Sequence, residues 1–251
     1  NSHICYQKNE INIHDGSIIF CVNRSIDTLF HYVKKEEIKD LTLITNQTDE
    51  KISKNIFNRL PKQFSSWYSI NVDYLHSNLY PIPLGVSNGY EKNLSFESKS
   101  IDIDLSVFTR KKEHLLYLSF EDNTNIRLRS GLKSYFSKYD WAKIVNNKNE
   151  LYEYKNDLKS SNFVLCPQGN GIDTHRIWEA LYYGSIPVVE EHVGFNKFKG
   201  LPIFFINNFL NITQESLIDF LDKLVVSDLN LITNNYWEDQ IVKKENKDKN
   251  L

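Results

Sequence analysis

An arginine and a glutamate three residues apart, Arg176 and Glu179, follow a short segment that contains two glycines, Gly169-Asn170-Gly171. Glycine can adopt positive φ and lets a ligand approach main-chain N–H groups closely. Asp173 or Thr174 is a candidate N-cap of the helix that follows. A guanidinium and a helix N-terminus both neutralise a diphosphate, and a carboxylate can accept hydrogen bonds from a ribose diol. The segment therefore predicts a nucleoside diphosphate site, with Arg176 on the phosphates and Glu179 on the ribose.

Two apolar runs bracket these polar residues. Phe163 to Cys166 has the length of a fully buried strand, which Pro167 ends, and Gly184 with Ile186 to Val189 predicts a helix stop followed by the next parallel strand. A strand, a glycine turn and a helix occur in every doubly wound protein. An arginine and a glutamate three apart also form ordinary solvated ion pairs. The local pattern alone thus leaves a purely structural interpretation open.

The whole string from Phe163 to Val189 resembles the donor-binding signature of the exostosin family of glycosyltransferases, and more distantly that of fucosyltransferases. The resemblance implies an α/β protein of GT-B architecture, with two Rossmann-like domains whose parallel sheets face an interdomain cleft. It also implies a nucleotide-sugar donor, commonly a UDP-sugar, without an obligatory metal ion. On this resemblance Arg176 binds the diphosphate and Glu179 contacts the donor. His175 stands where the family usually has serine, so it either donates to the leaving phosphate or has a capping or packing role.

Alternating strand and helix patterns predict two domains, an acceptor domain at residues 1–100 and a donor domain at residues 101–251. The polar segment 88–104 is the predicted linker. A final helix near residues 235–244 is expected to pack back on the first domain. The predicted strands are 17–22, 41–45, 67–70, 80–84, 115–119, 141–145, 163–166, 186–189 and 203–206, and the predicted helices include 50–60, 125–137, 151–160, 214–226 and one that ends near residue 38.

Arg127 and Arg129 follow the first predicted strand of the second domain. Ligands of open parallel sheets bind at the carboxyl ends of the strands. We expect one or both arginines to reach the same diphosphate as Arg176. A surface helix that happens to carry two arginines is the alternative interpretation.

The triplet Asp102-Ile103-Asp104 matches the DxD pattern with which GT-A glycosyltransferases hold a divalent ion. It lies in the predicted linker and no long strand precedes it. We therefore expect no metal site and no cofactor, because the nucleotide-sugar is itself a substrate.

An inverting transfer needs a general base near the acceptor hydroxyl. Asp73 and Asp27 of the first domain are the candidates, because both follow predicted strands, with His14 and His76 behind them. Each of these residues is equally consistent with a cap, a turn or a surface position. The catalytic base is therefore the least defined part of the predicted site.

The 251 residues carry a formal net charge of −2, which argues against nucleic acid as a partner. Cys5, Cys21 and Cys166 have neither metal-ligand spacing nor a dense disulfide pattern, and no apolar run approaches the roughly 18 residues of a membrane span. We expect a cytoplasmic or membrane-peripheral protein, and the lack of an initial Met is compatible with a removed anchor.

These observations predict an inverting, metal-independent glycosyltransferase that moves a sugar from a nucleotide-diphosphate sugar, preferably a UDP-sugar, to a glycan or glycoconjugate. A non-catalytic nucleotide- or glycan-binding module of the same fold remains the alternative from another class. A retaining transferase of GT-B architecture is the third possibility, and it would need no first-domain base.

Overall fold

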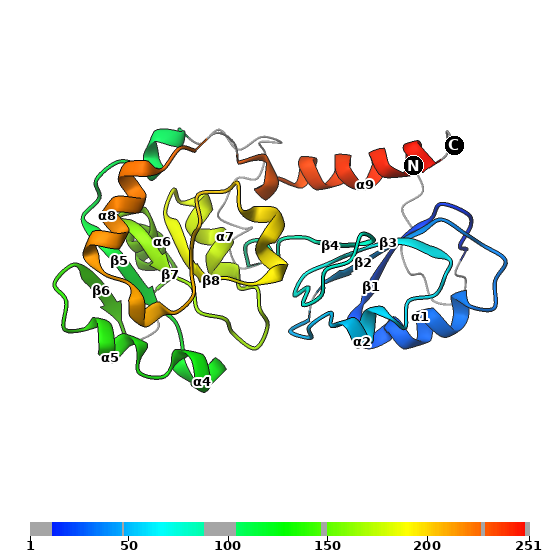
Figure 1. Cartoon of the computed structure of the whole chain (residues 1–251), viewed down its shortest axis with the longest axis horizontal. Coiled ribbons are helices and arrows are strands. Elements are labelled where there is room, and N and C mark those ends of the chain that lie inside the picture. Colours follow the sequence, from blue (N-terminus) through cyan, green and yellow to red (C-terminus); the bar gives the residue numbers. More distant parts are fainter. Residues whose placement is uncertain (1–11, 47, 88–103, 147–149, 227–228, 249–251) are drawn as a thin grey trace. The chain divides into compact units, whose positions relative to one another are not determined.

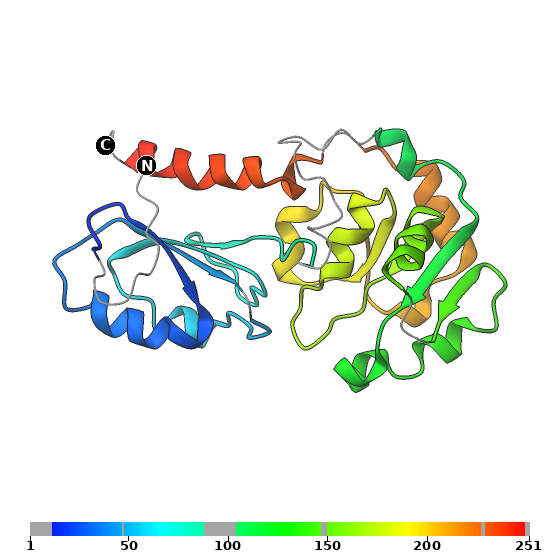
Figure 2. The same cartoon turned by 180° about the vertical axis from the view of Figure 1, so that it is seen from behind.

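A computed structural model describes residues 12–46, 48–87, 104–146, 150–226 and 229–248 of the chain (Figures 1 and 2). The chain divides into a first unit, residues 1–83 with 237–251, and a second unit, residues 84–236. Each unit contains its own parallel β-sheet, of four and five strands respectively. The predicted α/β class with two Rossmann-like sheets is thereby confirmed. Most of the predicted linker, residues 88–103, lies outside the described residues.

The sheet of the first unit has the strand order β1-β2-β3-β4, and every neighbouring pair is parallel. Successive right-handed crossovers in one direction place the intervening helices on one face of the sheet, where Figure 1 shows α1 and α2. The elements are β1 (Ile18–Val22), η1 (Asn23–Ser25), α1 (Ile26–Val33), β2 (Leu41–Asn46), α2 (Lys54–Phe57), β3 (Phe64–Ser69), β4 (Leu79–Pro81) and α9 (Asn234–Asp248), which enters this unit at Trp237.

The core of the first unit lies between this sheet and its helices, with Trp67 of β3 at its centre. Phe30 of α1 and Phe57 of α2 pack against the Trp67 ring at centroid distances of 6.0 and 6.2 Å. The indole Nε1 of Trp67 donates to Thr45 Oγ1 at 2.8 Å, so the one polar atom of this buried ring has a partner. The alternation of buried residues along β1 follows from the pleat of a strand that faces this core.

The sheet of the second unit has the order β6-β5-β7-β8-β9. From β5 the chain moves to β6 on one side, then crosses back to β7 on the other, so the direction reverses between β5 and β7. The elements are η2 (Leu105–Phe108), β5 (His114–Ser119), η3 (Asp122–Asn125), α4 (Ile126–Arg129), α5 (Leu132–Phe136), β6 (Ala142–Val145), α6 (Leu151–Lys159), β7 (Ser161–Leu165), α7 (His175–Tyr182), β8 (Ile186–Glu190), η4 (Val193–Phe198), β9 (Phe204–Ile206), η5 (Phe209–Asn211), α8 (Gln214–Lys223) and η6 (Asn230–Ile232).

The reversal identifies where a ligand is expected. In open parallel sheets the crevice for a ligand lies outside the carboxyl ends of the two strands at which the order reverses. In the second unit these are the ends of β5 and β7, from which the chain continues at Phe120 and Cys166. The sheet of the first unit runs in one direction throughout and has no such point.

Several predicted helices are shorter than the sequence indicates. The helix predicted at 125–137 is two helices, α4 and α5, because Gly131 between them has φ of 82°, outside the helical region. The helix predicted to end near residue 38 ends at Val33, and the one predicted at 50–60 is confined to Lys54–Phe57. In the latter case Ile52 pairs with Val72 as an isolated bridge, which excludes it from a helix.

The turn between α7 and β8 is tightly specified, as the predicted helix stop at Gly184 indicates. Gly184 has φ of +73°, and a β-carbon on it would lie 2.4 Å from Val107 Cγ1. The ammonium of Lys112 donates to the Gly184 carbonyl at 2.6 Å. Burial lowers the pKa of Lys112 to about 8. The end of α7 is thus held in place by neighbours on the η2–β5 segment.

Candidate functional site

Three cations surround one aromatic ring at the carboxyl end of β5. Phe120 is 4% exposed, and its ring centroid lies 5.2 Å from Lys133 Nζ, 5.5 Å from Arg129 Cζ and 5.8 Å from Arg176 Cζ. We call these four residues the Phe120 cluster. Contact with the ring stabilises each cation, but the like charges repel one another. The cluster lies at the strand reversal and has the electrostatic character of an anion site.

Arg176 is the member of the cluster that has unused hydrogen-bonding capacity. It is the second residue of α7, it is partly buried, and its Nε is shielded from solvent without an acceptor among the described residues. The hydroxyl of Thr174, the N-cap residue, is likewise buried without a partner in the described part of the chain and makes no capping bond. A buried polar group without a partner costs free energy, so the start of α7 carries two donors whose hydrogen bonds the described residues do not supply.

Arg129, a predicted candidate for the diphosphate, donates hydrogen bonds to the main chain in this structure. It is 4% exposed, and Nε, Nη1 and Nη2 donate to the carbonyl oxygens of Gln168, Glu121 and Pro167 at 2.9, 2.9 and 3.1 Å. It thereby joins the segments that follow β5 and β7. Burial, and secondarily the charge of Arg176, lower the pKa of Arg129 to about 10, which still leaves it cationic at neutral pH. Arg127, its predicted companion, is exposed on α4.

The loop after β7 is fixed through its carbonyl groups. Besides the bonds from Arg129, Asn125 Nδ2 donates to the Gly169 carbonyl at 2.8 Å. In a trans peptide the carbonyl and the following N–H point in opposite directions. The N–H groups of Gln168, Gly169 and Asn170 therefore point away from the arginine and asparagine that hold the loop.

The reason for glycine in this loop differs from the predicted one. The positive-φ glycines in the described residues are Gly16, Gly85, Gly131 and Gly184, and neither Gly169 nor Gly171 is among them. Instead, a β-carbon on Gly169 would lie 3.3 Å from Arg129 Nη2. Close approach of the guanidinium, rather than backbone conformation, explains the glycine. Both glycines are buried, and Asn170 between them is exposed.

Asp173 and His175 hold the beginning of the second unit against α7. Asp173 Oδ2 accepts from Leu84 N at 2.8 Å, and Trp178 Nε1 donates to both carboxylate oxygens of Asp173 at 2.8 and 3.0 Å. His175 Nδ1 lies 2.7 Å from the carbonyl oxygen of Gly85, to which it donates. Burial raises the pKa of Asp173 to about 7. Both side chains thus hold the segment at Leu84 and Gly85 next to α7. The N-cap residue of α7 is Thr174, the second of the two predicted candidates.

Glu179 faces the interior of the second unit. It is 5% exposed, and its Oε2 accepts from the hydroxyl of Tyr154 on α6 at 2.9 Å. Its neighbour Tyr183 has its pKa raised to about 12, mainly by burial and further by the Glu179 charge. An ion pair of Arg176 with Glu179, the purely structural interpretation of their spacing, is not among the salt bridges of the described residues.

The two base candidates lie in the first unit. Asp27 is in the first turn of α1 and forms an ion pair with Arg59, with both side chains more than half exposed. Asp73 is exposed in the segment after β3, and its N–H donates to the Ile52 carbonyl at 3.0 Å. His14 precedes β1 and so lies at the amino end of the sheet, the wrong edge for the predicted role. His76 packs on Phe57 with ring centroids 4.4 Å apart.

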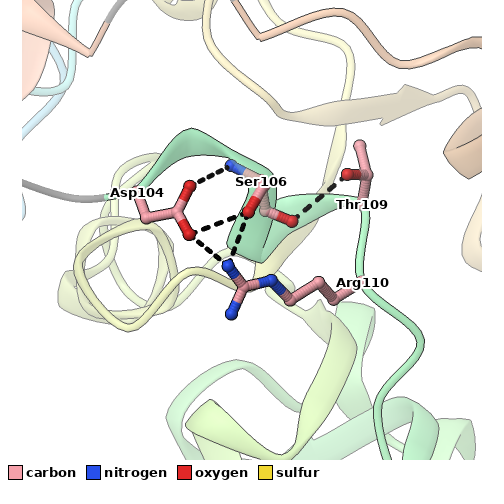
Figure 3. A network of polar contacts seen from close by, with 4 residues as sticks. All are labelled: Asp104, Ser106, Thr109 and Arg110. Atoms are coloured by element: carbon pink, nitrogen blue, oxygen red, sulfur yellow. Dashed lines mark hydrogen bonds and ion pairs between the residues drawn. The ribbon is translucent and has the colours of Figure 1, made fainter.

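Asp104, the described member of the DxD triplet, has a local structural role. It is the N-cap of η2 and accepts from Ser106 N at 3.0 Å and Ser106 Oγ at 2.8 Å (Figure 3). It also pairs with Arg110, and the hydrogen bonds from Ser106 lower its pKa. Asp102 and Ile103 lie outside the described residues. Within the described ranges no group of three or more His, Cys, Asp or Glu side chains could hold a metal ion.

The remaining predictions concern cysteines and membranes. Cys21 and Cys166 are free and buried, and Cys5 lies outside the described residues. Burial raises the pKa of Cys166 to about 12, so this thiol is protonated at neutral pH. Among the helices that the structure describes, none is both long enough and apolar enough to cross a bilayer.

Local sequence reasoning missed two members of the site, Phe120 and Lys133. Phe120 directly follows a predicted strand, and its place at the carboxyl end of that strand could have indicated it. Lys133 lies in the stretch predicted as an ordinary surface helix, and only the packing of α5 brings its ammonium to the Phe120 ring. The two cations Lys133 and Arg176, both in contact with the Phe120 ring, can bind a ligand with more than one negative charge.

Comparison with known proteins places the similarity on this part of the chain. A family model described as the RXYLT1 C-terminal domain matches residues 127–201, which include Arg129, the loop after β7 and α7. Over 41 residues the chain is 49% identical to ribitol-5-phosphate xylosyltransferase 1 of Homo sapiens. That alignment spans 16% of this chain and 9% of the human protein. The chain is thus partially and distantly related to a xylosyltransferase, and the segment that the family model matches carries Arg176.

Proposed function

We propose that the protein is a glycosyltransferase that binds a nucleotide-diphosphate sugar at the Phe120 cluster. The observation that carries this proposal is the shielded Nε of Arg176, which has no acceptor among the described residues although it lies at the strand reversal of the second unit. A diphosphate would supply that acceptor and would reduce the repulsion between Arg176 and Arg129. The partial similarity to a xylosyltransferase supports sugar transfer as the reaction class.

The proposed chemistry is displacement at the anomeric carbon with a nucleoside diphosphate as leaving group. Negative charge grows on the diphosphate as the sugar–oxygen bond breaks. A guanidinium and an ammonium positioned beforehand stabilise that charge most in the transition state. Arg176 and Lys133 would supply these charges, the start of α7 would add its main-chain N–H groups, and Arg129 would hold the loop that shapes the site.

The proposal also covers the ribose contact, the base, the nucleotide and the metal requirement. Glu179 would contact the ribose, with its carboxylate oriented by the Tyr154 hydroxyl. Asp73 and Asp27 are the candidate bases for an inverting reaction, which would take the proton of the acceptor hydroxyl. A GT-B arrangement of the two units, a UDP-sugar as donor and independence of divalent metal complete the proposal. A donor with xylose is the first to test, given the name of the human relative.

A ligand and hydrolysis screen tests the proposal. Thermal unfolding would be followed with UDP, GDP and CMP and with their sugar conjugates, UDP-xylose among them, each with and without EDTA. We expect a diphosphate to raise the midpoint, because a ligand that binds only the folded state stabilises it. Slow release of free sugar from the same donor would then separate a transferase from a pure binding module. No stabilisation by any nucleotide would contradict the proposal.

Two further readouts decide the finer points. Loss of activity on EDTA treatment would overturn metal independence and make Asp102 and Asp104 the candidate metal ligands. The anomeric configuration of the product separates inversion from retention, and a retained configuration would remove the need for Asp73 or Asp27 as base.

A further inference from the structure

A polar pocket of about 660 Å³ lies beside the Phe120 cluster, at the carboxyl ends of β5 and β6. Its volume is within the usual range for sites that bind small organic ligands. It is formed by the segment after β5, one side of α5 and the end of β6. Its polar lining consists of the acids Glu121 and Asp122, the amides Asn123 and Asn146, the hydroxyls Ser134 and Ser137, and the ammonium of Lys133.

The lining of this pocket favours hydroxyl groups over phosphates or a base. The two carboxylates outnumber the single ammonium of Lys133, so a phosphate would be repelled. No aromatic side chain is among the lining residues, so a base would find no ring to stack on. Carboxylates accept from hydroxyls, and amides and serines both donate and accept. Each hydroxyl of a sugar also donates and accepts, so the lining can satisfy several of them.

Asp122 lines the pocket with a carboxylate that is only partly used by the protein. Its Oδ1 is shielded from solvent and has no hydrogen-bond partner in the described residues. The nearest cation is Lys133, whose Nζ lies 3.9 Å away, beyond hydrogen-bond distance. The Asp122 side chain as a whole is 46% exposed, so its accessible part can accept from a ligand hydroxyl in the pocket while the Lys133 contact is kept.

Lys133 connects this pocket to the proposed diphosphate position. Its side chain is 13% exposed, it lines the pocket, and its ammonium is also in contact with the Phe120 ring. Arg129 fixes the main chain between the pocket and the Phe120 cluster, because it donates to the carbonyl of the lining residue Glu121. A ligand with an anionic group next to a polyhydroxyl group would therefore meet cations at Phe120 and hydroxyl-binding groups in the pocket.

We infer that this pocket binds a neutral polyhydroxyl moiety of the donor, either the ribose or the transferred sugar. The inference rests on the proposed function for the identity of the anion, while the pocket itself is defined by its own lining. The ribose and the transferred sugar can be told apart, because UDP carries only the ribose whereas UDP-xylose carries both. Glu179 is the other candidate contact of the ribose.

The test compares Asp122→Asn with Asp140→Asn. Asp140 is an exposed aspartate that precedes β6 and is not among the pocket-lining residues, so it controls for the same chemical change on the same connection. Asn146→Ala is the second pocket variant, since it leaves the Asp122–Lys133 pair intact. Affinities for UDP and for UDP-xylose would be measured by calorimetry on the full chain, with unfolding curves recorded for each variant.

The two sources give distinct patterns. A roughly tenfold loss of affinity for both ligands in both pocket variants identifies the ribose, and a loss confined to UDP-xylose identifies the transferred sugar, since each variant removes a hydrogen-bonding group from the pocket. Unchanged affinity for both ligands in folded pocket variants overturns the inference while the proposed function stands.

If the wild-type protein binds no nucleotide, the proposed function fails and the pocket is tested separately. Amide resonances would be followed in the presence of free xylose and free ribose. Shifts at Ser134 and Ser137 that disappear in Asp122→Asn would still support a polyhydroxyl site. Resonances that stay unshifted in the wild type would overturn it.

Discussion

The Arg129 guanidinium lies 3.3 Å from the point where a β-carbon of Gly169 would be placed. The two residues come from opposite sides of the strand reversal, one from α4 and the other from the loop after β7. Their proximity lets a single side chain reach the carbonyls of both segments. The shape of the proposed donor site therefore depends on a buried cation that does not itself need to touch the ligand.

Replacing Arg129 by lysine should destabilise the second unit. The ammonium keeps the charge but cannot serve three carbonyls in fixed directions, so buried acceptors lose partners. We expect the free energy of unfolding, measured in urea, to fall by about 2–4 kcal/mol, with weaker nucleotide binding. Arg127→Lys, an exposed arginine on the same helix, is the matched control and should change stability by less than about 0.5 kcal/mol. Equal effects of the two substitutions would refute a positioning role for Arg129.

Replacing Arg176 by alanine should separate binding from stability. Its guanidinium is repelled by Arg129 and its Nε lacks an acceptor in the described chain, so its loss should leave the unfolding midpoint unchanged or slightly raised. Nucleotide affinity should fall roughly ten- to hundredfold, because a charged hydrogen bond to the diphosphate is lost. Arg176→Lys should recover part of that affinity. A folded Arg176→Ala variant with wild-type affinity and turnover would remove Arg176 from the site.

Gly184→Ala should be strongly destabilising, whereas Gly200→Ala should not. A methyl group on Gly184 would meet Val107 at 2.4 Å in a backbone conformation that favours glycine, while nothing lies within 4 Å of the corresponding point on Gly200. Overpacking together with backbone strain predicts a loss of about 2–4 kcal/mol. Chemical denaturation of the two variants side by side measures the difference. Comparable midpoints would show that the α7–β8 turn tolerates a different conformation.

Asp173 should give the protein a distinctive dependence of stability on pH. Its pKa is about 7 in the folded state and 3.8 in the reference state, so the folded protein binds the extra proton between these values. The free energy of unfolding should therefore be largest near pH 4 for this group and decrease toward pH 7, by up to about 4 kcal/mol. Asp173→Asn should lose that slope and Asp140→Asn should retain it, as read from urea unfolding at several pH values. A slope that survives in Asp173→Asn would assign it to another group.

The strands were predictable because buried parallel strands appear in the sequence as short apolar runs. Ser161–Leu165 and Ile186–Glu190 are buried on both faces apart from the half-buried Glu190; Pro167 follows the first run and Gly184 precedes the second. The helix boundaries were less predictable, since short helices such as α2 depend on tertiary contacts more than on propensity. The position of Arg176 at the start of a helix was predictable for a similar reason, because the turn and the helix around it are local features.

The role of Arg129 could not be predicted from local patterns. Its acceptors are main-chain carbonyls of residues near 121 and 167–168, and a carbonyl is present at every position of a sequence. Which carbonyls converge on a side chain is decided by the strand order. The same holds for Lys133, whose contact with Phe120 depends on how α5 packs beside β5.

The bond from the Leu84 amide to the Asp173 carboxylate gives the second unit a built-in spectroscopic reporter. An amide that is bonded to a buried acceptor exchanges its hydrogen with solvent only when that bond opens. Asp173 also accepts from Trp178 within α7, so opening at Leu84 reports on the first turn of the helix that carries Arg176. The exchange rate of one backbone proton at the start of the unit can thus follow the order of the proposed donor site without a catalytic assay.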